Sequence, residues 1–114
     1  MLSGANISHL HRLASDEMWH FIEGSPAEIA IISPEGLLEI VRLGGNVSSG
    51  ERFTVLIPRG SWFGAWVAGS GNDAYSLFSC TVVPGFDYRD FELGRLDELL
   101  QLFSEHKEII CKLT

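Results

Sequence analysis

The chain has few cysteines, few basic residues and no long hydrophobic run. Two cysteines, Cys80 and Cys111, allow at most one disulfide, and their apolar neighbours favour buried free thiols in a reducing compartment. Eight Lys and Arg against fifteen Asp and Glu give a formal net charge of −7, which repels nucleic-acid phosphates. The hydrophobic runs are far shorter than the ~20 residues of a membrane-spanning helix. These shortages exclude a nucleic-acid partner and a membrane span.

Residues 1–6 contain neither a basic region nor an apolar core, so we expect no secretory leader. We therefore expect a cytoplasmic protein. The 114 residues suffice for one domain and are too few for two, so we expect a single domain over residues 1–114. A hydrophobic content of 46% and 12 glycines are typical of a compact, turn-rich domain.

Hydrophobic periodicity predicts a series of short strands followed by helices. The predicted strands cover residues 7–13, 17–22, 27–33, 37–43, 52–57, 61–68 and 75–83. A helix from Ser15 competes with the second strand, but Trp19, Phe21 and Ile22 lie close together and favour a strand. From Arg95 the period becomes helical, and the apolar positions are Leu96, Leu99, Leu100, Phe103, Ile109, Ile110 and Leu113. The pattern predicts an all-β jelly-roll barrel with short C-terminal helices packed outside its sheets.

The stretch from Ser8 to Gly24 concentrates the residues that could do chemistry, including three of the four histidines. A period of two places His9 and His11 on one face of the first predicted strand. One face of the second predicted strand carries Glu17, Trp19 and Phe21. His20 lies on its other face, where we expect a structural role.

The spacing in this stretch resembles the first sequence motif of the cupins. That motif has a glycine, the pair His-x-His, a glutamate after three to five further residues and a glycine seven residues later. The counterparts here are His9, His11, Glu17 and Gly24, with the leading glycine, Gly4, one residue out of place. The second cupin motif, Pro-x-Gly followed by a histidine, resembles Pro58-Arg59-Gly60, but Phe63 holds the histidine position.

Longer blocks resemble one cupin family, DUF985 (Cupin_5). The most specific blocks read DEMWHF at residues 16–21 and VPGFDYRDFEL at residues 83–93. The remaining blocks are His11-Arg12, Leu43-Gly44, residues 57–65, residues 75–77 and Leu113-Thr114. The resemblance covers nearly the whole chain.

The resemblance implies a cupin double-stranded β-helix akin to the RmlC-type sugar-nucleotide epimerases, and a homodimer. The biochemical role of the family is largely uncharacterised. Family members usually carry some tens of residues before the His-Arg element, whereas this chain starts almost at it. That difference bears on the sheet edge and on the dimer contacts.

Metal binding is one function that the first motif suggests. Imidazole and carboxylate groups bind divalent transition metals, and His9, His11 and Glu17 could converge in a barrel. Because Phe63 removes the usual fourth ligand, the set is incomplete and we favour no cofactor. His9, so near the start of the chain, is otherwise explained as an exposed residue.

Metal-free acid–base chemistry is the function that we favour. A histidine oriented by a carboxylate exchanges protons near neutral pH, and RmlC-type epimerases use such a pair beside a carbonyl. Here His11 would be the base, oriented by Glu17 or Asp16. The predicted reaction is isomerase- or epimerase-like, on a sugar or a related polar metabolite.

Aromatic side chains are expected to line one pocket in the barrel mouth. The predicted ligand-contacting residues are Trp19, Phe21, Trp62 and Tyr75, although ordinary core packing explains any single tryptophan better. The alternative function is a ligand-binding or regulatory module without turnover, because a fold does not determine a function. The acidic segment 87–93 is expected to pin the helices to the barrel rather than to form a ligand rim, and His106 is expected at the surface.

Overall fold

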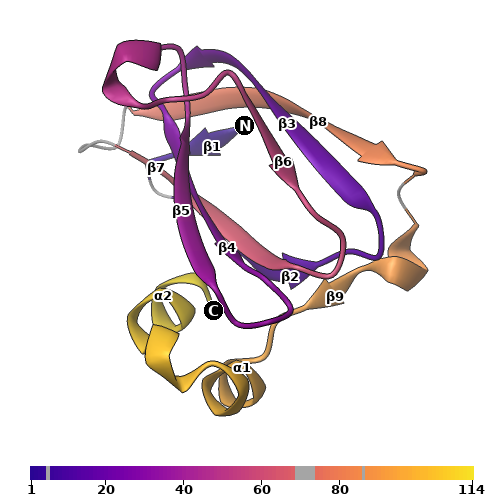
Figure 1. Cartoon of the computed structure of the whole chain (residues 1–114). Helices are drawn as coiled ribbons and strands as arrows, with labels where there is room; N and C mark the ends of the chain where they lie inside the picture. The colour runs from indigo at the N-terminus through magenta and orange to yellow at the C-terminus, as the bar shows by residue number, and fades with distance from the viewer. Residues whose placement is uncertain (5, 69–73, 86) are drawn as a thin grey trace.

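The computed structural model describes residues 1–4, 6–68, 74–85 and 87–114. Two antiparallel sheets face one another, and two short helices cover the outer face of one of them (Figure 1). The predicted all-β jelly-roll with C-terminal helices is therefore confirmed. No helix among these residues is long and apolar enough to cross a membrane.

The first sheet has the strand order β1-β8-β3-β6 and the second the order β5-β4-β7-β2-β9. The strands of the first sheet are β1 (Leu2–Ser3), β8 (Tyr75–Val83), β3 (Asp16–Gly24) and β6 (Thr54–Ile57). Those of the second are β5 (Leu38–Leu43), β4 (Ala27–Ile32), β7 (Trp62–Val67), β2 (Ile7–Arg12) and β9 (Glu92–Leu93). All seven predicted strands are present, and the bounds of β8 agree with the prediction.

The helical elements are short. The 3₁₀ helices are η1 (Val47–Ser49), η2 (Tyr88–Asp90) and η3 (Ser104–His106), and the α-helices are α1 (Leu96–Leu102) and α2 (Lys107–Leu113). The acidic segment at residues 87–93 contains η2 and β9, and β9 extends the second sheet beside β2.

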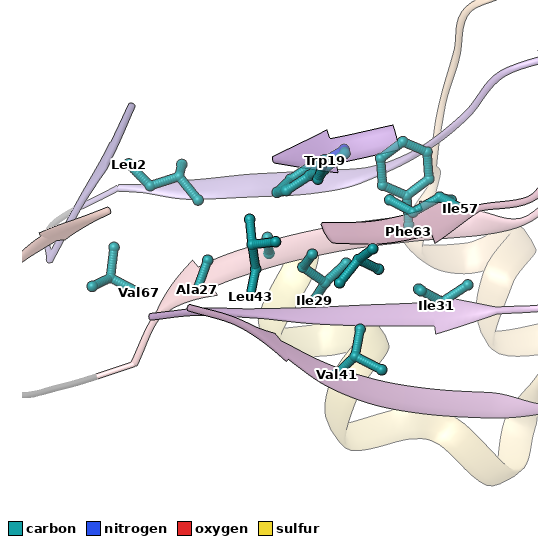
Figure 2. Close-up of a cluster of buried hydrophobic side chains, with 12 residues drawn as sticks. Leu2, Trp19, Ala27, Ile29, Ile31, Val41, Leu43, Ile57, Phe63 and Val67 are labelled. Atoms are coloured by element: carbon teal, nitrogen blue, oxygen red, sulfur yellow. The ribbon is translucent and has the colours of Figure 1, made fainter. Parts of the chain in front are cut away.

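Two hydrophobic clusters lie on opposite faces of the second sheet. The inner cluster fills the space between the sheets (Figure 2) and includes Trp19, Ile29, Ile31, Val55, Ile57 and Phe63. The outer cluster joins the sheet to the helices and includes Leu10, Ile32, Trp62, Leu99, Phe103, Ile110 and Leu113. Strand β4 contributes to both clusters, which explains its continuous apolar sequence. Each of these large side chains contributes about 1.5–3 kcal/mol by leaving water.

The structure corrects two expectations about single residues. Cys80 and Cys111 are free, as expected, but both are exposed rather than buried. His106 is not a surface residue: its side chain is 16% exposed, and its Nε2 lies 2.7 Å from the Gly36 carbonyl oxygen. That contact ties η3 to the β4–β5 turn.

Candidate functional site

Strand β3 turns the predicted residues Glu17, Trp19 and Phe21 toward the space between the sheets. Glu17 is 8% exposed and Trp19 3% exposed, whereas Phe21 packs at the edge of the inner cluster. The Trp19 indole donates a hydrogen bond from Nε1 to the Glu17 carboxylate. Trp19 also stacks on Phe78 of β8, with ring centroids 4.4 Å apart. The predicted alternation on this strand is confirmed, and it places a carboxylate in an aromatic environment.

His11 reaches the same inner space from the second sheet. The pairing of β2 with β7 is irregular between Ser8 and His11, so Leu10 enters the outer cluster while His11 lies opposite Phe63. The His11 and Phe63 ring centroids are 4.1 Å apart, and Phe91 stacks against the His11 ring at 5.4 Å. Two phenyl rings therefore contact the imidazole.

The backbone holds one nitrogen of this imidazole. His11 Nδ1 lies 2.7 Å from the His9 carbonyl oxygen. Because a carbonyl oxygen can only accept, we assign the proton of the neutral ring to Nδ1. Nε2 is then the nitrogen with a lone pair, which is the form that a base or a metal ligand requires.

The two adjacent carboxylates have different partners. Asp16 accepts from Arg59 at the backbone nitrogen (2.9 Å) and at Nε (3.3 Å). The Arg59 backbone N–H, and after it the Arg59 side chain, holds the pKa of Asp16 below its usual value. Glu17 is held by Trp19 instead. The orienting partner of His11 is thus a backbone carbonyl, where the sequence predicted a carboxylate.

Cys80 is a further inner residue that the sequence did not single out. It pairs in register with Trp19, so its side chain shares the inner face of the first sheet. Burial of the thiol, followed by the charge of Glu17, raises its pKa to about 12, even though part of the residue is exposed. The thiol therefore stays protonated at neutral pH.

A metal site from the first motif is not assembled. Among the described residues, no group of three or more His, Cys, Asp or Glu side chains could hold a metal ion. His9 is exposed, Glu17 is bound to Trp19, and Phe63 fills the inner face beside His11. The prediction of a ligand set made of His9, His11 and Glu17 has no support from this geometry.

Three other residues that the sequence singled out, Trp62, Tyr75 and His20, lie away from His11 and Glu17. Trp62 lies in the outer cluster, under the Arg12 guanidinium at 4.5 Å from the ring centroid. The Tyr75 hydroxyl donates to Glu23 (3.1 Å), and this bond raises the pKa of Tyr75. His20 lies on the opposite face of β3 from Glu17, 3.3 Å from the Thr81 hydroxyl. Period two on strand β7 places Trp62 and Phe63 on opposite faces, so only one of them can face His11.

Phe91 is the neighbour of His11 that the sequence did not identify. It precedes β9, whose residues Leu93 and Glu92 pair with His11 and Arg12. The Arg12 guanidinium donates to the Glu92 carboxylate from Nε (2.9 Å) and from Nη2. The segment 87–93 therefore holds Phe91 over His11, and β9, paired with β2, directly precedes α1. Phe91 is 38% exposed and forms the outermost contact of the imidazole.

Three surface grooves lie away from this inner group. Two flank Arg12, and the third lies along η3 and α2. None of the three is lined by His11 or Glu17.

Comparison with known proteins supports the predicted resemblance. The model of the cupin superfamily family Cupin_5 (DUF985) matches residues 1–94. The chain is similar to a Shewanella oneidensis protein of known crystal structure, with 42% identity and a TM-score of 0.92, covering 99% of this chain and 70% of that one. A hypothetical protein from Leishmania major is 36% identical, with a TM-score of 0.91 and coverage of 99% and 72%.

The fold likeness extends to a cupin enzyme. Bacillus subtilis oxalate decarboxylase is 18% identical in one structure, with a TM-score of 0.56 over 95% of this chain and 28% of that one. At this identity the likeness shows the fold alone. No curated protein matches the chain.

Proposed function

The chain belongs to the Cupin_5 (DUF985) family of the cupin superfamily, and from that premise we propose that its barrel binds a small polar molecule on which His11 transfers a proton. The reaction class is isomerase- or epimerase-like, on a sugar or a related metabolite. The observation that carries the proposal is the bond from His11 Nδ1 to the His9 carbonyl oxygen, which leaves Nε2 as the basic nitrogen.

The same bond supports both halves of a proton transfer. When Nε2 takes a proton from the carbon beside a carbonyl, the imidazolium keeps its Nδ1–H on the His9 oxygen, and that oxygen stabilises the positive charge. Nε2 can then return the proton to a different atom or face of the substrate. Glu17 and Trp19, which are buried and bonded to each other, would support the substrate site from the core, while Phe21, at the edge of the inner cluster, would contact the ring of the substrate.

Binding without turnover is the second candidate. It is favoured by the engagement of both carboxylates, since Asp16 is bound to Arg59 and Glu17 to Trp19. Neither is positioned by these bonds to relay the proton that His11 would gain. A ligand would then be recognised by the same inner residues and released unchanged.

Deuterium exchange separates the two candidates without knowledge of the product. We expect the protein in D₂O to exchange a C–H beside the carbonyl of at least one compound in a panel of keto sugars and nucleotide sugars, read by proton NMR. His11→Gln should slow this exchange at least about 100-fold, because a positioned general base contributes 10²–10⁴-fold. His20→Gln, on the other face of β3, is the matched control and should exchange at the parent rate.

Two outcomes contradict the enzyme proposal. One is exchange that persists at the parent rate in His11→Gln. The other is a panel compound that binds, shifting the His11 ring signals, while no member of the panel exchanges. The second outcome assigns the chain to the binding class.

A further inference from the structure

A groove of about 340 Å³ lies on the outer side of the second sheet, opposite to the face that carries His11. Four separate parts of the chain form it: the end of β2, the β4–β5 turn, the β6–β7 turn and the junction of α1 with η3. The lining residues used below are Arg12, Pro34, Glu35, Trp62, Phe103 and Glu105. Its volume is in the range of small-molecule sites.

The floor of the groove is apolar and aromatic. Trp62 and Phe103 are buried members of the outer cluster, and Leu102, which also lines the groove, is 66% exposed. Leu102 is thus the apolar side chain that the chain itself leaves uncovered, beside the mostly buried rings of Trp62 and Phe103. The groove therefore suits a ligand with an apolar body.

The charged residues of the groove leave an excess of negative charge. Arg12 already donates to Glu92 from Nε and Nη2 and stacks on Trp62, so its charge is compensated. No ion pair in the described part of the chain involves Glu35. Among the described residues, the only ion-pair partner of Glu105 is His106, at 3.7 Å, which is charged only when protonated. Two carboxylates thus border the apolar floor without a permanent counterion.

We propose that this groove binds an organic ammonium ion with an aromatic or aliphatic body. The body covers Trp62, Phe103 and Leu102, and the ammonium group lies between the Glu35 and Glu105 carboxylates. An anionic ligand is disfavoured because it would meet these carboxylates and Glu92 at the occupied Arg12. The site is independent of His11, and part of its wall, residues 102–105, lies beyond the segment matched by the family model.

The test uses 2-phenylethylammonium as the probe and the three tryptophan indole N–H signals as reporters. The signals are assigned with Trp62→Phe, Trp66→Phe and Trp19→Phe. We expect the probe to shift the Trp62 signal with a dissociation constant in the millimolar range, and to leave the Trp19 and Trp66 signals in place. Added salt should weaken binding, because the carboxylates are exposed. Phenylacetate and 2-phenylethanol, which match the probe in size but not in charge, should bind at least several-fold more weakly.

Charge-neutralising variants test whether the Glu35 and Glu105 carboxylates bind the ammonium group of the probe. Glu35→Gln and Glu105→Gln should each weaken probe binding about two- to five-fold, the range of an exposed ion pair, and the double variant about ten-fold. Glu108→Gln removes the same charge from α2 outside the groove and should bind the probe like the parent. The proposal is overturned if the Trp62 signal does not move up to the solubility limit. It is equally overturned if 2-phenylethanol binds as well as the probe, or if Glu108→Gln weakens binding as much as Glu105→Gln.

Discussion

Replacing Trp19 with alanine is expected to lower the free energy of unfolding by about 3–5 kcal/mol, the range for truncating a buried aromatic side chain. Trp19 is 3% exposed, stacks on Phe78 and contacts the edge of Phe63 with centroids 6.1 Å apart. The truncation removes these contacts and leaves the buried Glu17 carboxylate without its indole donor. Since single domains are stable by only about 5–15 kcal/mol, this change alone could leave little margin.

A second variant separates the contribution of ring packing from that of the indole hydrogen bond. Trp19→Phe keeps a ring against Phe78 but removes the Nε1 donor, and should cost about 1–3 kcal/mol, the price of a buried acceptor without its partner. Adding Glu17→Gln to Trp19→Phe should recover part of that cost, because a neutral amide needs less compensation than a carboxylate. Urea unfolding followed by circular dichroism measures all three. A loss below 1 kcal/mol for Trp19→Ala would contradict the packing described for β3.

Gly24→Ala is expected to destabilise the fold by about 2–4 kcal/mol, through both backbone strain and overpacking. Gly24 has a φ of +99°, which L side chains rarely adopt. A Cβ there would lie 2.4 Å from the Tyr75 carbonyl oxygen, in the backbone of the neighbouring strand β8. The glycine that closes the first motif is thus required where β3 ends against β8.

The matched control for this glycine is Gly85→Ala. A Cβ at Gly85 would have no neighbour within 4 Å among the residues that the structure describes, and the φ of Gly85 lies outside the positive range. Its free energy of unfolding should stay within about 0.5 kcal/mol of the parent. Equal effects of the two substitutions in thermal unfolding would show that the close approach at Gly24 is not what makes glycine necessary.

Local patterns predicted the strands well because each pattern is a direct consequence of burial on one or two faces. The inward alternation of Glu17, Trp19 and Phe21 follows from period two on a regular strand. The helical spacing of Leu99, Phe103, Ile110 and Leu113 likewise predicted a face that covers the sheet. These elements needed no knowledge of distant contacts.

The expectations about the site failed where a side chain depends on a distant segment. The irregular pairing of β2 with β7 separates His9 from His11, and strict alternation cannot predict such an irregularity. Phe91 reaches His11 only because the Arg12–Glu92 ion pair and β9 bring residue 91 beside β2. The sequence does not show which face of β7 carries Trp62, because an aromatic residue suits either face of a strand. Only the packed helices show that its face is the outer one.

The position of the proton on the neutral His11 ring tests the proposed proton transfer most directly, and nitrogen-15 NMR of the histidine rings measures it. With His11 assigned by His11→Gln, the neutral ring should show a proton on Nδ1 and a bare Nε2, because Nδ1 donates to the His9 carbonyl oxygen. A neutral ring with its proton on Nε2 would contradict the account. That form has no lone pair facing the substrate and could not accept the proton that the proposed reaction removes.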